Sequence, residues 1–171
     1  MKRLVLISLA AVLSLSAFSQ TSGIGIGARV GTNIDFTAKF WTGETSAFAL
    51  AAGFDYGGYW GGIHASADYL FHLWSFDVGQ DMMKVYFGPG VGVGYSLRDQ
   101  YYYLYDSWYD DYNYDNYSRF WLTVRAPGGV GYYFNNMPLE CFVEFAPGID
   151  IIGPNGFHTR FDSYVGARWY S

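Results

Sequence analysis

Hydrophobic and polar residues alternate with a period of two along most of the chain after residue 22. In the stretch GIGIGARVGTNIDFTAKF, residues 23–40, the even positions other than Thr32 carry Ile, Ala, Val and Phe, whereas the odd positions carry glycine, polar and charged residues. Successive side chains of an extended chain point to opposite faces. The alternation therefore predicts β-strands that have one apolar face and one polar face.

The same test predicts the number of strands. Further alternating segments occupy residues 47–55, 62–73, 84–96, 120–133, 139–151 and 162–170. A single strand over 23–41 would be too long, because a tilted strand crosses a bilayer in about 9 to 11 residues. A turn at 31–33 divides it, places Val30 opposite Ile34 and pairs Arg29 with Asp35. The predicted fold class is all-β: an eight-stranded antiparallel transmembrane up-and-down β-barrel.

The polar face is expected inside this barrel and the apolar face in lipid. An eight-stranded interior is just wide enough for side chains to fill it, and buried charges there must be paired. Outward positions between strand ends carry no Asp, Glu, Lys or Arg, and such a charge would cost roughly 2 to 4 kcal/mol at mid-bilayer. The predicted interior network comprises Arg29, Asp35, Asp55, His64, Asp68, Lys84, Arg125, Glu140, Glu144, Asp150 and Arg168, with Lys39 and Asp162 on the same face.

Aromatic composition fits a membrane barrel. Aromatic residues make up 22% of the chain, which contains 17 Tyr, and residues of this type form girdles at membrane interfaces. The residues predicted to lie in such girdles are Phe40, Trp41, Trp60, Trp74, Tyr95, Tyr132, Phe134 and Trp169. A soluble barrel of the lipocalin kind is the competing interpretation. It would keep its apolar residues inside, which the glycine-rich polar faces fit poorly.

The N-terminal segment has the pattern of a secretory signal peptide. Lys2 and Arg3 precede an apolar run to Leu15, and small residues Ala17 and Ser19 follow. We expect residues 1–19 to be the signal peptide and residues 20–171 to form one barrel domain. The formal net charge is -5, and an acidic chain without a basic stripe makes nucleic acid an unsuitable partner.

One connection stands out by length and composition. If both chain ends lie in the periplasm, residues 31–33, 57–60, 98–119 and 153–160 face outside the cell. Tyrosine offers a large, stiff contact area with a polar tip, as binding surfaces use. The predicted surface-recognition residues are Tyr101, Tyr102, Tyr103, Tyr105, Trp108, Tyr109, Tyr112, Tyr114 and Tyr117. The alternative interpretation of 98–119 is a strand extension with a solvated cap.

No motif predicts catalysis or metal binding. Residues 111–115 resemble the start of a calcium loop, but Asn116 and Leu122 occupy the glycine and glutamate positions of an EF-hand. His64, Ser66 and Asp68 follow one strand about 7 Å apart, too far for a nucleophile and its base. We expect no catalytic residue, no metal and no cofactor, and therefore a protein that is not an enzyme.

Several segments resemble a known family. GARVG, FALAAGFDYGGY, YFGPGVGVGY, PLECFVEFAPGIDIIG and YVGARWY are similar to small eight-stranded outer-membrane barrels of Bacteroidetes-type Gram-negative bacteria, within the OmpA/OmpX-like porin group. The resemblance covers most of the mature chain and implies a location in the cell outer membrane. It implies outer-membrane lipid and the barrel assembly machinery as partners. Ser171 departs from the family, whose barrels usually end in an aromatic residue.

Three functions are compatible with this sequence. The first is a structural or surface-recognition role through residues 98–119, with an unidentified surface ligand. The second is a small pore, and the third is a lipid-modifying outer-membrane enzyme.

Overall fold

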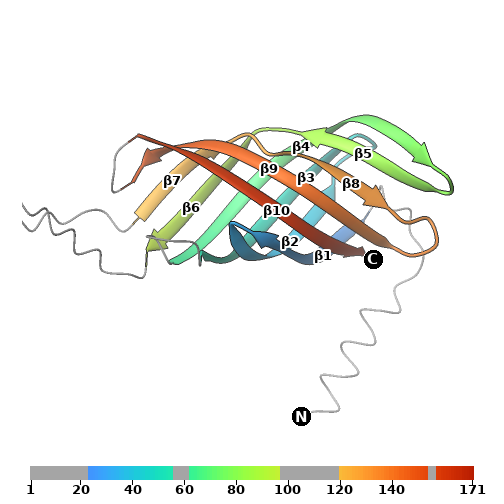
Figure 1. The fold of residues 1–171 in the computed structure, drawn as a ribbon, viewed down its shortest axis with the longest axis horizontal. Helices are drawn as coiled ribbons and strands as arrows, with labels where there is room; N and C mark the ends of the chain where they lie inside the picture. Colours follow the sequence, from blue (N-terminus) through green and yellow to red (C-terminus); the bar gives the residue numbers. More distant parts are fainter. Residues whose placement is uncertain (1–22, 56–61, 97–119, 154–156) are drawn as a thin grey trace, which may run out of the picture.

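The computed structural model describes residues 23–55, 62–96, 120–153 and 157–171. In these ranges the chain forms antiparallel strands (Figure 1). They are β1 Ile24–Gly31, β2 Asn33–Trp41, β3 Ser46–Asp55, β4 Gly62–Val78, β5 Asp81–Phe87, β6 Gly90–Ser96, β7 Phe120–Arg125, β8 Gly128–Tyr133, β9 Leu139–Ile152 and β10 His158–Tyr170. The described residues contain no apolar helix of membrane-spanning length.

The strands close on themselves. β1 pairs with both β2 and β10, and β10 also pairs with β9. β5 and β6 lie end to end against β4, and β7 and β8 lie end to end against β9. Each pair of short strands therefore occupies one place in the ring, which gives the eight antiparallel positions predicted from the alternation.

Prolines divide the two strands predicted at 84–96 and 120–133. The ladder is interrupted at Gly88–Pro89 and at Ala126–Pro127, because proline has no N–H to donate to a neighbouring strand. Main-chain bonds still cross the interruption, since Gly88 N–H donates to the Pro127 carbonyl at 2.9 Å. The prediction that each of these segments forms one continuous strand was wrong. The prediction of which side chains point inward and which point outward was correct on both sides of each break.

The predicted turn at 31–33 is confirmed, whereas the predicted loop at 153–160 is too long. Val30 lies opposite Ile34 and Arg29 opposite Asp35. β10 begins at His158 and pairs with β9 from its first residue. Arg160 consequently belongs to a strand and points into the barrel.

β4 extends beyond the predicted end at residue 73. Ser46, the first residue of β3, pairs with Phe71, so the last part of β4 pairs with β5 alone. The register shifts between His72 and Trp74, which is a β-bulge. Gly79, with φ of 68°, makes the tight turn to β5. The resulting hairpin projects past the other strands at the end of the barrel that carries the C-terminus (Figure 1).

Asp81 links this hairpin by hydrogen bonds to the turn between β8 and β9. Its carboxylate accepts a 2.8 Å bond from the Asn135 main-chain N–H and a 2.7 Å bond from the Tyr132 hydroxyl. The bond from the Asn135 N–H, and to a smaller extent the bond from Tyr132, lowers the pKa of Asp81 below the 3.8 of a free aspartate. A lowered pKa means that the bonds stabilise the fold above 3.8 and are lost as the pH falls through the lowered value.

We predict that Asp81→Asn weakens this connection without unfolding the barrel. The Asn135 amide proton should exchange with solvent faster in the variant, because the neutral amide is a weaker acceptor than a carboxylate. In the unmodified chain the NMR shift of the same amide should titrate below pH 3.8. An Asn135 amide that exchanges equally fast in both proteins would contradict the claim that the Asp81 carboxylate accepts its hydrogen bond.

Side chains divide between two faces as the alternation predicts. The outer face carries large exposed apolar residues, among them Phe36 at 78%, Phe161 at 64% and Phe54 at 62% exposure. Within the described strands, Asp77 and Asp81 are charged side chains that are not buried inside the barrel, and both lie in the hairpin formed by the end of β4 and the start of β5. Cys141 is exposed on this face. Most of the other charged side chains of the strands point inward and are buried.

Candidate functional site: the charged interior of the barrel

The predicted interior network is assembled in the structure, with one exception. Asp150 is only half-buried, near the end of β9, where it accepts a hydrogen bond from Thr123. The other predicted members are all buried, and they are Arg29, Asp35, Asp55, His64, Asp68, Lys84, Arg125, Glu140, Glu144 and Arg168. They divide into two clusters along the barrel.

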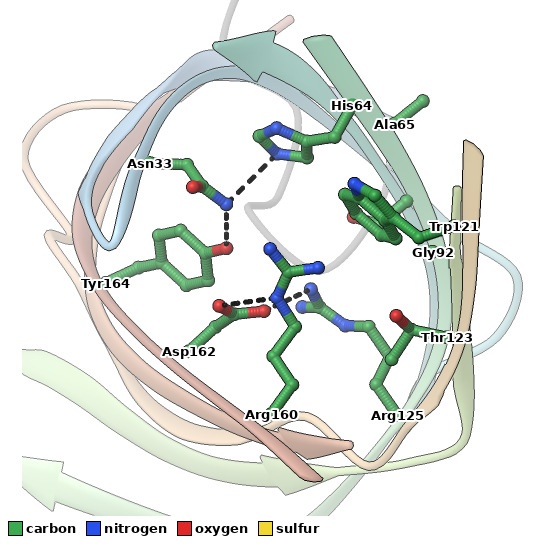
Figure 2. A pocket seen from close by; sticks show the side chains of 11 residues that line it. Asn33, His64, Ala65, Gly92, Trp121, Thr123, Arg125, Arg160, Asp162 and Tyr164 are labelled. Carbon is green, nitrogen blue, oxygen red and sulfur yellow. Dashed lines mark hydrogen bonds and ion pairs between the residues drawn. The ribbon is translucent and has the colours of Figure 1, made fainter. Parts of the chain in front are cut away.

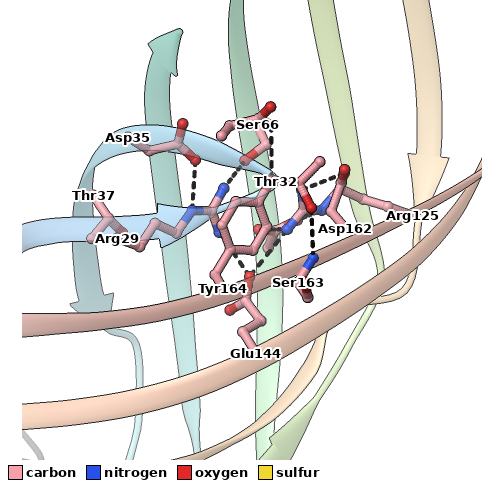
Figure 3. A network of polar contacts seen from close by, with 12 residues as sticks. Arg29, Thr32, Asp35, Thr37, Ser66, Arg125, Glu144, Asp162, Ser163 and Tyr164 are labelled. Atoms are coloured by element: carbon pink, nitrogen blue, oxygen red, sulfur yellow. Dashed lines mark hydrogen bonds and ion pairs between the residues drawn. The ribbon is translucent and has the colours of Figure 1, made fainter. Parts of the chain in front are cut away.

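The first group, the arginine cluster, is centred on Glu144. Its carboxylate lies 2.7 Å from Arg29 Nη1 and 3.1 Å from Arg125 Nη2, so one acid bridges two guanidinium groups (Figure 3). Arg29 Nε also lies 2.7 Å from Asp35, as the strand register predicts. The Arg29 guanidinium stacks 3.9 Å from the centre of the Tyr164 ring. These contacts join strands that are far apart in the sequence.

Arg125 and Arg160 extend the arginine cluster. Arg125 Nε lies 3.0 Å from Asp68, and Arg160 contacts Asp55 at 3.3 Å and Asp162 at 3.4 Å. Arg160 was missing from the predicted network, because it was assigned to a loop. Its parity with Asp162, Tyr164 and Arg168 along one strand is the signal that could have found it. All charges of the cluster thus have a partner of opposite sign.

His64, Ser66 and Asp68 do not form a catalytic arrangement with one another. They lie opposite Gly53, Ala51 and Ala49, the positions predicted. His64 Nε2 lies 2.9 Å from Asp35, and Ser66 accepts a 3.3 Å bond from Arg29. Each of the three is therefore engaged with a different residue of the arginine cluster.

A small cavity lies beside the arginine cluster. It is lined by Asn33, His64, Trp121, Arg160 and Tyr164, among others, and these side chains converge on it from four strands (Figure 2). Its volume of about 10 Å³ is room for about one water molecule.

The second group, the Glu140 cluster, lies at the end of the barrel where β1 begins and β10 ends. Glu140 Oε1 accepts from Lys39 at 3.0 Å and from the Tyr133 hydroxyl at 2.9 Å. Glu140 Oε2 accepts from Arg168 at 3.3 Å and from the Tyr170 hydroxyl at 2.6 Å. One buried carboxylate therefore serves four donors.

Aromatic rings fill the remaining interior, and glycines opposite them make room. A Cβ on Gly94 would lie 2.2 Å from the ring of Trp121, its partner across the strands. A Cβ on Gly25 would lie 2.7 Å from the ring of Tyr170 in the same arrangement. The alternation placed these glycines and rings on one face. It did not show that they form cross-strand pairs, which depends on register.

Trp41 corrects one predicted girdle position. It is an odd-numbered residue of β2 and points inward, where its ring lies 4.4 Å from that of His72. Trp41 was predicted to lie in a girdle because it is at the end of a strand. Its odd number, shared with Asp35 and Lys39, already indicated the inward face. Trp74, Tyr95 and Trp169 do lie on the outer face. Trp60 and the predicted recognition residues 101–117 lie outside the described residues.

One solved structure identifies the fold. The N-terminal β-barrel domain of Pseudomonas aeruginosa OprF is similar to this chain with a TM-score of 0.55 and 14% identity, over 85% of this chain and 93% of that one. No protein-family model matches the sequence. No curated protein matches it either. At this identity the likeness shows the fold alone, an all-β antiparallel barrel.

Proposed function

We propose that the chain is an outer-membrane β-barrel protein of the OmpA/OmpX-like group, with a structural or surface-recognition role through residues 98–119. The observation that carries the proposal is the reversal of faces: charges are buried in paired clusters, and phenylalanine, isoleucine and valine are exposed outside. A water-soluble barrel has the opposite arrangement. Lipid is the solvent that such an outer face suits.

The filled interior supports a structural or recognition role over conduction. The arginine cluster and the Glu140 cluster occupy successive levels of the barrel, and the cavity beside the first holds about one water. We assign no reaction to His64 and Ser66 either, since both are bonded to residues of the arginine cluster. Stable conductance steps in planar bilayers would favour the pore instead.

The positions of lysine and arginine allow a direct test of the orientation. Of the 10 Lys and Arg residues in the chain, Arg98 and Arg119 flank the long segment. Lys2 and Arg3 lie in the predicted signal peptide, and the remaining six point into the barrel, as Arg29 does. We expect trypsin added to intact cells to cut after Arg98 and Arg119 and to release residues 99–119.

The products would be identified by mass spectrometry of the supernatant and of the membrane fraction. Arg98→Gln combined with Arg119→Gln is the control variant and should resist the enzyme on intact cells. Cleavage that requires permeabilised cells would place residues 98–119 on the periplasmic side. That result would overturn the surface-recognition proposal and leave the barrel itself intact.

A further inference from the structure

The hairpin of β4 and β5 continues the outer wall past the other strands, at the end of the barrel that carries the C-terminus (Figure 1). After Phe71, β4 pairs with β5 and with no other described strand. Side chains 73–78 are all exposed, and Trp74, Phe76 and Val78 are 59%, 49% and 43% exposed. Large apolar side chains are therefore left uncovered by the rest of the described chain.

The β-bulge after His72 determines which way these side chains point. His72 is buried on the inner face, and unbroken alternation would turn Trp74 and Phe76 inward as well. The register shift between His72 and Trp74 instead pairs Trp74 with Val85, an outward residue of β5. Bulges change the direction of side chains in this way. The apolar residues therefore stay on the outer face, and Asp77 lies on the inner side of the hairpin.

These side chains belong to a larger aromatic surface. Phe76, Met83 and Tyr132 form one row across β4, β5 and β8. The ring of Phe134 lies 4.9 Å from that of Tyr132, whose hydroxyl is bonded to Asp81. Rings of Trp and Tyr with a polar tip are enriched where a membrane meets water. We call this surface the hairpin patch, and it comprises Trp74, Phe76, Val78, Met83, Tyr132 and Phe134.

The outer face of β4 is taller than the hydrocarbon core of a bilayer. Its outward positions from Ile63 to Val78 carry no charged residue and span about 50 Å, at about 3.3 Å per residue. A strand tilted by about 40° then covers about 38 Å along the membrane normal. The hydrocarbon core is about 30 Å thick, and the bilayer with its headgroups about 40 to 45 Å. The hairpin patch therefore reaches beyond the core but not beyond the headgroups.

We propose that the hairpin patch binds the phospholipid headgroup layer of the leaflet at the end of the barrel where β1 begins and β10 ends. The patch is continuous with the lipid-facing wall, and its Trp and Tyr suit the boundary between hydrocarbon and water. Asp77 and Asp81 lie at the tip of the hairpin, where headgroups and water solvate them. This role depends on the proposed membrane location.

A second copy of this chain does not fit the unpaired edge of β4. Antiparallel pairing of two such edges needs a two-fold axis perpendicular to the sheet. In a barrel wall that axis lies in the membrane plane, so the two copies would be inserted in opposite directions. Copies inserted in the same direction are related by an axis along the membrane normal. Lipid is therefore the partner that this hairpin favours.

The test uses spin labels on the purified barrel in phosphatidylcholine vesicles. In a Cys141→Ser background, Phe76→Cys places a label on the patch, and Asp77→Cys is the matched control on the inner side of the same hairpin. Phe36→Cys is the reference for the middle of the lipid-facing wall. The ratio of collisions with oxygen to collisions with a water-soluble nickel complex should be lowest at 77, higher at 76 and highest at 36.

Three results at residue 76 would overturn the headgroup site. A ratio equal to that at 77 would place the hairpin in water, and a ratio equal to that at 36 would place it in the hydrocarbon core. A label that neither reagent reaches would show that another protein surface covers the patch. Val78→Cys provides a second outward position if Phe76→Cys does not fold. A label on the native Cys141 that reports lipid would confine each of these failures to the hairpin.

Tryptophan quenching provides a second readout that needs no label. The barrel is reconstituted in phosphatidylcholine brominated either near the headgroup or near the end of the acyl chain. The quenching that disappears in Trp74→Phe belongs to Trp74, and it should be larger with the bromines near the headgroup. Equal or larger loss with the deep bromines, or no loss with either lipid, would overturn the headgroup site.

Discussion

Replacing Phe36 by arginine should destabilise the barrel in lipid vesicles by about 2 to 4 kcal/mol, the cost of a cation on a lipid face near mid-bilayer. Phe36 lies in the middle of β2 and is 78% exposed on the outer face. In a water-soluble protein the same substitution would be nearly neutral, because surface changes usually alter stability by less than about 0.5 kcal/mol. The measurement is the urea unfolding midpoint in phosphatidylcholine vesicles, followed by tryptophan fluorescence.

Phe40→Arg is the matched control for depth. Phe40 is an outward residue of the same strand but lies next to its end, where a cation costs about 0 to 1 kcal/mol. A large cost at residue 36 and a small cost at residue 40 would define the membrane level of β2. Equal and small costs at both positions would contradict a lipid-facing wall.

Glu140→Gln should be the most damaging single change in the interior. The variant leaves Lys39 and Arg168 buried without their carboxylate, and breaking a buried ion pair costs about 3 to 5 kcal/mol. The hydroxyls of Tyr133 and Tyr170 also lose a charged acceptor. We expect a large fall in the urea midpoint, or failure to reach the folded, heat-modifiable form on a detergent gel.

Glu44→Gln is the control for this change. Glu44 lies exposed in the turn between β2 and β3, so its neutralisation should change the stability by less than about 0.5 kcal/mol. Equal stabilities of the two variants would contradict the central role of Glu140. A Glu140→Gln variant with an unchanged urea midpoint and normal gel mobility would also contradict the claim that buried ion pairs stabilise the interior.

The alternation was sufficient to predict faces and local register. It placed Arg29 against Asp35 and placed the interior acids and bases on one side, because a period of two relates sequence directly to orientation. Contacts across the barrel, such as Arg29 with Glu144, depend on the closure and shear of the sheet, which no local pattern contains. The bridging role of Glu144 and the four donors around Glu140 therefore required the structure.

The remaining errors have local physical causes. Proline interrupted the ladder at Pro89 and Pro127 without disturbing the parity, so a parity test could not detect the breaks. The bulge after His72 and the long β4 follow from residues that alternate poorly beyond Leu73. Trp41 was assigned from its place at a strand end, although its parity already placed it inside.

The single cysteine provides the most direct test of the central claim, that the outer face of this barrel meets lipid. Cys141 is exposed on the outer face of β9, so a spin label on it reports that environment without any mutation. In reconstituted vesicles we predict that oxygen, which concentrates in lipid, relaxes the label far more than a water-soluble nickel complex. A label that collides freely with the nickel complex would place this face in water and contradict the account.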